Sequence, residues 1–414
     1  MFLLLEKLVD DSKKENTMEL IMFDIIMLLL IKIDMYKYDN QIVPLTIVGT
    51  IYTALINFNN IVATKIYGFK EINSYTLYIL FIFFTMIFAI DYFFGKIYQH
   101  IIKEDFNENI PFENYRVLFG LFAIGVSAYL LQFVRLYRID GFDIKGKNNG
   151  ILGHICSFAF ILGPVVLDLA IKSKKKIRVM MTVVMNITVI IISILFGGKY
   201  VLLINTTYLL LYFILKRNMH TTVKSMIKVA IPLCIITLLL FIVLYYFIPI
   251  ITGQYQSSIY FAVQHMFYYL LGPILGNNYA LSHMGRGNPL VPYTVGINIF
   301  KALLGKGDYI SPLMPFVFQV SDTELVNVSG LIGEVAYDMG LKNSLIYIGV
   351  IFIIINILLL IYRCYNKCYL SLVYLFAILV FSFFCNFFTV SGVVLPLLLA
   401  FMIDIFSILK KSKS

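Results

Sequence analysis

Four basic side chains are of a type and position that could bind a phosphorylated ligand. They are Lys199, within the stretch FGGKY, and Arg135, Arg138 and Arg286. Guanidinium and ammonium groups bind phosphate oxygens strongly, so the four could together hold a diphosphate head group. Arg135 and Arg138 are three residues apart, a spacing that puts both on one face of a helix. Lys199 has a simpler alternative, which is to reach lipid head groups.

A second group of titratable side chains lies between residues 250 and 342, in a stretch rich in Gly, Pro and Asn. They are His265, His283, Arg286, Lys301, Lys306, Asp308, Asp322, Glu324, Glu334 and Asp338. A connection of this length is uncommon in a compact protein unless it binds or catalyses. The stretch therefore predicts a functional site, and its alternative is a plain external cap.

The composition indicates an integral membrane protein. Apolar residues make up 60% of the chain and charged residues only 14%, and the mean hydropathy is +0.87. The apolar runs are continuous and do not alternate, which favours membrane-spanning helices over a barrel. The net charge of +10 fits basic residues retained on the cytoplasmic side, so it does not imply a nucleic acid partner.

The sequence predicts an all-α polytopic fold of about eleven transmembrane helices. The expected spans are 18–33, 41–58, 74–95, 115–134, 150–171, 178–196, 199–215, 226–249, 343–362, 369–388 and 391–409. We expect 257–276 to be re-entrant or interfacial, because it contains Gln264 and His265 and ends in Gly and Pro. The run 288–305 is suited to a short amphipathic helix on the membrane surface.

Basic loops set the expected orientation. KSKKKIR (172–178) and the loop 216–228 should both be cytoplasmic, which places FGGKY and residues 250–342 on the outer side. The chain is therefore expected to comprise an N-terminal bundle of about eight spans (1–249), a large extracytoplasmic loop (250–342) and a three-span C-terminal segment (343–414). The same count puts residues 1–17 outside, although Lys7, Lys13 and Lys14 favour the opposite side.

The segment from 323 to 352 resembles the Wzy-type oligosaccharide repeat-unit polymerases of bacterial surface polysaccharide pathways. In that family an Asn-Val pair, then an aromatic and Asp-Phe-Gly, lead from the large outer loop into a late span. Asn327-Val328 and Tyr337-Asp338-Met339-Gly340 are similar to that block, with Met in place of Phe. FGGKY resembles the family's Gly-x-Arg hairpin, with Lys199 in place of Arg, which removes the planar fork that grips phosphate.

The resemblance implies a membrane glycosyltransferase that joins undecaprenyl-diphosphate-linked repeats on the outer leaflet of the bacterial cytoplasmic membrane. Substrate binding would fall to Lys199, Arg135, Arg138, Arg286, Asn327 and Tyr337, and the general base to Glu324, Asp338 or His283. No metal or cofactor is expected. The implied partners are the lipid-linked oligosaccharide, membrane lipid, and the chain-length regulator and flippase of the same pathway.

Two other functions remain open from the sequence. A flippase for the same lipid-linked sugars should show two similar halves and charges within mid-membrane spans, and neither is evident. An O-antigen ligase should carry a His-Asn block with an upstream Arg, which His283-Met-Gly-Arg286 does not reproduce. Among single residues, Asp338 has the alternative role of a helix cap or turn before Gly340, and Glu334 that of a loop charge.

Overall fold

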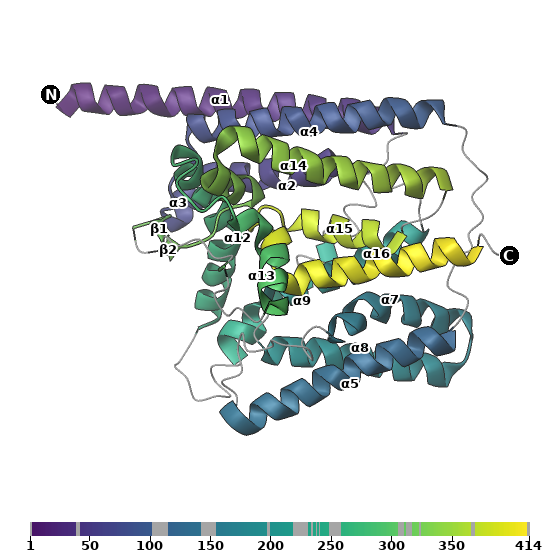
Figure 1. The fold of residues 1–414 in the computed structure, drawn as a ribbon. Helices are drawn as coiled ribbons and strands as arrows, with labels where there is room; N and C mark the ends of the chain where they lie inside the picture. The colour runs from purple at the N-terminus through teal and green to yellow at the C-terminus, as the bar shows by residue number, and fades with distance from the viewer. Residues whose placement is uncertain are drawn as a thin grey trace. The chain divides into compact units, whose positions relative to one another are not determined.

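The structure is a computed structural model, and helices account for most of the chain that it describes (Figure 1). The described residues are 2–38, 42–101, 115–141, 155–196, 199–217, 231–232, 235–236, 238–239, 241–247, 258–304, 310–311, 317–322, 324–365 and 369–411. Contacts divide the chain into two compact units, each assembled from stretches far apart in sequence. These units do not coincide with the three consecutive segments expected from the sequence. Those segments describe membrane topology and stay a prediction.

The first unit comprises residues 1–101, 267–357 and 379–390. Its elements are α1 (Phe2–Lys37), α2 (Pro44–Phe58), η1 (Asn59–Ala63), α3 (Thr64–Tyr67), α4 (Ser74–His100), most of α12 (Ile259–Ser282), η3 (Val291–Tyr293), α13 (Thr294–Leu303), β1 (Phe318–Gln319), β2 (Leu325–Val326), most of α14 (Leu331–Tyr365) and η4 (Phe387–Thr389). Capping side chains and special backbone conformations account for several helix ends. Pro44 begins α2, the Asn73 side chain caps α4 by accepting the Thr76 N–H, and Gly68 ends α3 in a left-handed conformation.

Hydrogen bonds to the side chain and backbone of buried Asp91 join four segments of the first unit. One oxygen of Asp91, on α4, accepts the backbone N–H of Leu45 at 2.8 Å, and the other accepts the Asn356 side-chain amide at 2.5 Å. The Tyr38 hydroxyl donates to the Asp91 carbonyl and lies 3.2 Å from the Asn356 amide oxygen. These bonds tie α2, α14 and the end of α1 to α4, and α1 lies along α4 in Figure 1.

The second unit comprises residues 102–266, 358–378 and 391–414. Its elements are α5 (Tyr115–Asp140), α7 (Ser157–Lys172), α8 (Lys176–Leu195), α9 (Lys199–Arg217), η2 (Val243–Phe247), α15 (Tyr369–Val380) and α16 (Ser391–Lys411). α5 and α7 pack closely at Gly125, where an added Cβ would lie 2.6 Å from the Ala159 backbone nitrogen. Small residues allow this approach, as is usual between membrane helices.

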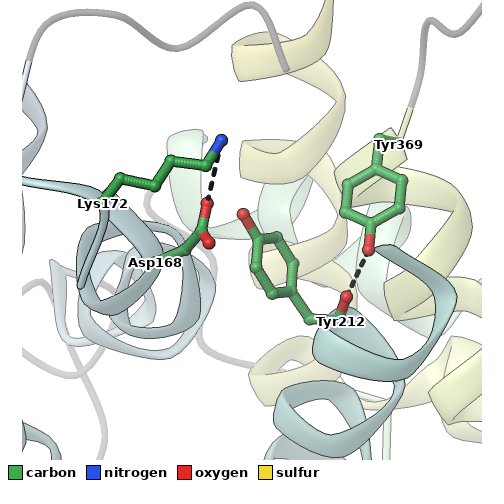
Figure 2. A network of polar contacts seen from close by, with 4 residues as sticks. All are labelled: Asp168, Lys172, Tyr212 and Tyr369. Atoms are coloured by element: carbon green, nitrogen blue, oxygen red, sulfur yellow. Dashed lines mark hydrogen bonds and ion pairs between the residues drawn. The ribbon is translucent and has the colours of Figure 1, made fainter. Parts of the chain in front are cut away.

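The second unit also contains a polar network among its helices (Figure 2). Asp168 pairs with Lys172 one turn along α7 at 3.9 Å, the Tyr212 ring on α9 points toward Asp168, and the Tyr369 hydroxyl donates to the Tyr212 carbonyl. Asp404 on α16 accepts three bonds from the start of α15: the Ser371 N–H and hydroxyl at 2.9 and 2.6 Å and the Leu370 N–H at 3.3 Å. This carboxylate therefore caps a helix whose first N–H groups lack partners within α15.

The chain is a multi-pass α-helical membrane protein. By length and composition, five helical segments of the described chain could cross a bilayer: Pro44–Tyr67, Ser74–His100, Tyr115–Ile139, Lys176–Leu195 and Leu331–Cys364. Shorter apolar helices cover Leu202–Leu215, Tyr369–Val380 and Ser391–Phe406. The expected count of eleven is not confirmed. Of the span predicted at 226–249, the structure describes 231–232, 235–236, 238–239 and 241–247, all of them helical. The predicted span 18–33 lies inside the longer helix α1.

Several predicted boundaries differ from the observed ones, three of them in the second half of the chain. α14 begins at Leu331, twelve residues before the expected start at 343, and α15 ends at Val380, where 388 was expected. α12 continues to Ser282 through Pro273, beyond the expected re-entrant segment. The described part of the large loop therefore has longer helices than the sequence predicts. It also contains a small antiparallel hairpin in which Phe318 pairs with Val326 and Gln319 with Leu325.

Candidate functional site

The turn that follows α12 lies against the first part of α14. The Gly285 N–H donates to the Ala336 carbonyl and the Gly287 N–H donates to the Tyr337 carbonyl, both at 3.0 Å. These two bonds join segments about fifty positions apart in sequence. We call residues 283–288 together with Tyr337 and Asp338 the turn–helix site.

Two glycines make this close approach possible. Gly285 and Gly340 have φ values of +76° and +75°, and a Cβ on Gly285 would meet the Gly340 backbone at 3.6 Å. With ψ at 168°, Gly340 occupies a backbone region that is essentially restricted to glycine, and it kinks α14. The kink separates the turn of α14 that carries Asp338 from the longer apolar part of the helix.

The Asp338 carboxylate is held between α14 and the turn. Its side chain is 7% exposed, and it accepts the backbone N–H of Asn288. A Cβ on Gly287 would lie 2.1 Å from the Asp338 carboxylate oxygen, so the absence of a side chain there leaves the room that the carboxylate fills. The carboxylate therefore bonds to the turn just before the Gly340 kink, which agrees with the structural alternative of a turn before Gly340.

His283 presents one ring nitrogen in a fixed direction. Its Nδ1 lies 2.9 Å from the Tyr279 carbonyl, and its ring stacks on the Tyr279 ring with 4.3 Å between centroids. The Ser282 hydroxyl donates to the same carbonyl at 2.9 Å. Nδ1 also lies 2.9 Å from the Ser282 hydroxyl. Since that hydroxyl donates to the Tyr279 carbonyl, which only accepts, we assign the proton of the neutral ring to Nδ1, and this assignment leaves Nε2 as an acceptor. In the described part of the chain, Nε2 has no hydrogen-bond partner.

Aromatic rings pack against one another beside the site. Tyr337 is 1% exposed and lies 6.4 Å from the Tyr279 ring, which itself stacks on Phe318 of β1 at 5.6 Å. Arg286 is exposed and lies near enough to Tyr337 to interact with it electrostatically. The site thus combines an oriented imidazole, a buried carboxylate and an accessible guanidinium. That set can take a proton and stabilise a developing negative charge.

Glu324 and Asn327 belong to the hairpin segment and not to the turn–helix site. Glu324 is half-buried, and its backbone helps to close the hairpin through the Val320 N–H and Ser321 hydroxyl. Asn327 is exposed just after β2. Within the described residues, neither side chain forms a hydrogen bond or an ion pair with His283, Arg286 or Asp338. Their predicted roles stay predictions.

The hairpin segment packs on small residues of α12. A Cβ on Gly272 would meet Val326 at 2.8 Å, and a Cβ on Gly276 would meet the Val328 carbonyl at 2.5 Å. The spacing Gly-x-x-x-Gly thus lets this segment lie close to the helix. The packing explains why the residues after β2 are ordered although they are outside any helix.

The other predicted cations belong to the second unit. Arg135 and Arg138 are exposed on α5, which confirms that both lie on one helix. Lys199 is the first residue of α9, but its side chain, with Gly197 and Gly198, lies outside the described residues. A vestibule shared by these cations and Arg286 stays a prediction.

Glu334 is a residue whose position sequence reasoning missed. It is 7% exposed, and its carboxylate accepts the Asn386 N–H at 2.7 Å and a backbone N–H from Ser329. The alternative role as a loop charge is therefore wrong: Glu334 holds the segment before η4 against the start of α14. Its spacing of four from Asp338, on one helix face, is the signal that could have indicated a buried position.

Comparisons with known proteins identify no relative of this chain. The chain matches no described protein family, no curated protein and no solved structure. In the described residues, no group of three or more His, Cys, Asp or Glu side chains could hold a metal ion.

Proposed function

We propose that the protein is a polymerase of lipid-linked oligosaccharide repeat units. It would join undecaprenyl-diphosphate-linked repeats by metal-independent glycosyl transfer on the outer leaflet of the bacterial cytoplasmic membrane. The resemblance of residues 323–352 to the Wzy-type family motivates this choice. The flippase and chain-length regulator of the same pathway would be its partners.

The association of His283, Arg286 and Asp338 in the turn–helix site is the observation that supports the proposal most. The Asp-Met-Gly part of the resembling block pairs with a turn that carries a candidate base and a cation. Gly285, Gly287 and Gly340 hold this pairing at close approach.

In the proposed reaction, a hydroxyl of one repeat attacks the anomeric carbon of the sugar attached to diphosphate. The hydroxyl proton passes to Nε2 of His283, the new C–O bond forms, and the bond between sugar and diphosphate oxygen breaks. Arg286 stabilises the negative charge that develops on the departing diphosphate. Asp338 positions the turn by accepting the Asn288 N–H. The proton acquired by His283 is then lost to water.

The test is the surface polysaccharide and the lipid-linked intermediates of a strain that lacks the gene. A polymerase defect leaves single repeats that have already reached the outer leaflet, and wild-type protein restores long chains. Retention of lipid-linked repeats on the inner leaflet would instead identify a flippase. Accumulation of complete polymer on its lipid carrier would identify a ligase. Either of these two results would overturn the proposal.

A further inference from the structure

The charged residues of α14 mark where this helix enters a bilayer. Residues 343–362, between Lys342 and Arg363, are twenty positions without a charged side chain. At ~1.5 Å per residue they span ~30 Å, the thickness of the hydrocarbon core of a bilayer. The kink at Gly340 precedes Lys342, so this run is helical throughout. Lys342 is exposed and therefore marks one edge of the core, because its ammonium group can reach the lipid head groups.

The short helix η3 is attached to α14 on the membrane side of this edge. The Tyr347 hydroxyl donates to the Pro292 carbonyl at 3.1 Å, and the Tyr347 and Tyr293 rings pack edge to face with 5.7 Å between centroids. Tyr347 follows Lys342 by five residues, which is ~7.5 Å along the helix. A side chain on a helix leans toward the N-terminal end, here toward Lys342, so η3 lies between that depth and the edge. Interfacial helices bury their apolar face to a similar depth.

The outward face of η3 and α13 is apolar. Tyr293, Phe300 and Leu304 are spaced seven and four residues apart, so they share one helix face, and all three are exposed, Phe300 by 63%. Gly296 belongs to the same face, and a Cβ there would meet nothing within 4 Å. Val295, on the opposite face, is buried. Two large rings and a leucine thus point away from the protein, an arrangement that is unfavourable in water and favourable among acyl chains.

The polar side chains of α13 are satisfied within the protein. The Asn298 side chain donates to the Ile310 carbonyl and accepts the Ile310 N–H, both at 2.8 Å. The Thr294 hydroxyl donates to the Val291 carbonyl at 2.5 Å. Lys301 is the only charged residue between positions 288 and 305, and its long stem can bring the ammonium group to the head groups. The helix can therefore enter lipid without leaving these polar groups unpaired.

We propose that η3 and α13 insert into the lipid leaflet beside α14, with Tyr293, Phe300 and Leu304 among the acyl chains. The turn–helix site pairs with α14 on the other side of Lys342, so the inserted helix holds that site at the level of the head groups. The sequence alone predicts a helix on the membrane surface, whereas the contacts of Tyr347 give its depth. Lipid is favoured over a second protein copy, because one short helix face is much smaller than a stable protein interface.

The natural absence of tryptophan provides a direct measurement of depth. Phe300→Trp and Tyr293→Trp each place one fluorophore in full-length protein, reconstituted in phosphatidylcholine vesicles with bromine near the start or near the end of the acyl chains. Both variants should lose most of their fluorescence to bromine near the start of the chains and less to bromine near the end. Acrylamide in the water should quench them weakly. Thermal melting of each variant checks that it is folded.

Two further variants calibrate the depth scale. Ile354→Trp replaces an exposed residue of α14 that follows Lys342 by twelve positions, ~18 Å along the helix. It should be quenched most by bromine near the end of the chains. Asp322→Trp replaces an exposed residue of the hairpin segment, and it should be quenched by acrylamide and not by brominated lipid.

Two results would overturn the inference. If acrylamide quenches Phe300→Trp and Tyr293→Trp as strongly as Asp322→Trp, α13 lies in water. If neither acrylamide nor bromine quenches them, protein covers this face, either another part of the chain or a second copy. The inference goes beyond the proposed reaction, and the fluorescence is measured without substrate. Its failure therefore leaves the polymerase proposal standing, and failure of the polymerase proposal leaves the depth of α13 unchanged.

Discussion

Buried carboxylates are used differently in the turn–helix site and in the helix bundles. Both oxygens of Asp91 accept hydrogen bonds, from the Leu45 N–H and the Asn356 amide, and Asp404 accepts three bonds from the start of α15. Asp338 accepts one backbone N–H, from Asn288, and lies in the same site as His283, whose Nε2 has no partner in the described chain. The hydrogen-bond acceptors of Asp91 and Asp404 are therefore occupied, whereas the turn–helix site keeps an acceptor without a partner in the described chain.

The difference separates polar residues that hold a membrane protein together from those that can react. An ionisable group inside a membrane protein is a functional candidate by default. Asp91 and Asp404 lose that status once their partners are known, because saturated groups have no capacity left for substrate. The turn–helix site retains an acceptor and a cation that are available to a substrate. It is therefore the better candidate for function.

The largest expected effect is on folding, at Asp91. Asp91→Leu leaves the buried Leu45 N–H and the Asn356 amide without their acceptor, at about 1–3 kcal/mol each. We expect little monodisperse protein in detergent and a sharply lower melting temperature. Asp91→Asn is the control, because its amide oxygen keeps one of the two acceptors and should give an intermediate loss. If Asp91→Leu melts at the wild-type temperature, a buried carboxylate with both oxygens hydrogen-bonded does not have to be structural.

The next effect is on activity, at His283. His283→Gln removes the acceptor Nε2 and should lower polymer formation about 10²–10⁴-fold, the usual contribution of a general base. The melting temperature should change little, because His283 is only half-buried. Asp338→Asn should lose less activity, since its amide oxygen can still accept the Asn288 N–H. If Asp338→Asn instead loses as much as His283→Gln, Asp338 takes the proton.

A smaller effect is expected at Gly340, where the kink in α14 depends on glycine. Gly340→Ala should lower the free energy of unfolding by about 1–3 kcal/mol, because an alanine is strained at this φ and ψ. Gly349→Ala in the same helix is the control, since its added Cβ would meet Met86 only at an ordinary 3.6 Å. It should be neutral or slightly stabilising. Chemical denaturation of both variants in detergent checks this, and equal losses would contradict the kink's role.

The smallest expected effect is at Ser371. Ser371→Ala removes the hydroxyl bond to Asp404 but leaves the two backbone bonds of Ser371 and Leu370. We expect a loss of about 1 kcal/mol in the free energy of unfolding and unchanged polymer formation. A loss of activity without a loss of stability would place Asp404 among the reacting groups and contradict its purely structural role.

Much of the fold could be predicted because the apolar runs are long and continuous. α4, α5 and α8 lie where the sequence places spans, with ends that differ by a few residues. Composition could not predict that α15 is short, because residues 381–388 are still largely apolar. They leave the helix for turns whose backbone bonds go to tertiary partners, such as Leu331 N–H to Ser382 O.

The candidate site was predictable by residue type and not by arrangement. The sequence indicated His283, Arg286, Tyr337 and Asp338, but their association depends on hydrogen bonds between residues about fifty positions apart. Glycines give the missing signal only once their neighbours are known, as with Gly287 beside Asp338. Lys199 remains a prediction from the FGGKY stretch alone.

The central claim is tested most directly with purified protein in nanodiscs, supplied with lipid-linked repeat units from its own strain. The measurement is the length distribution of the sugar product for wild type, His283→Gln and Ser371→Ala. The account predicts long chains from wild type and Ser371→Ala, and single repeats from a stably folded His283→Gln. Long chains from His283→Gln, at the wild-type rate, would contradict it.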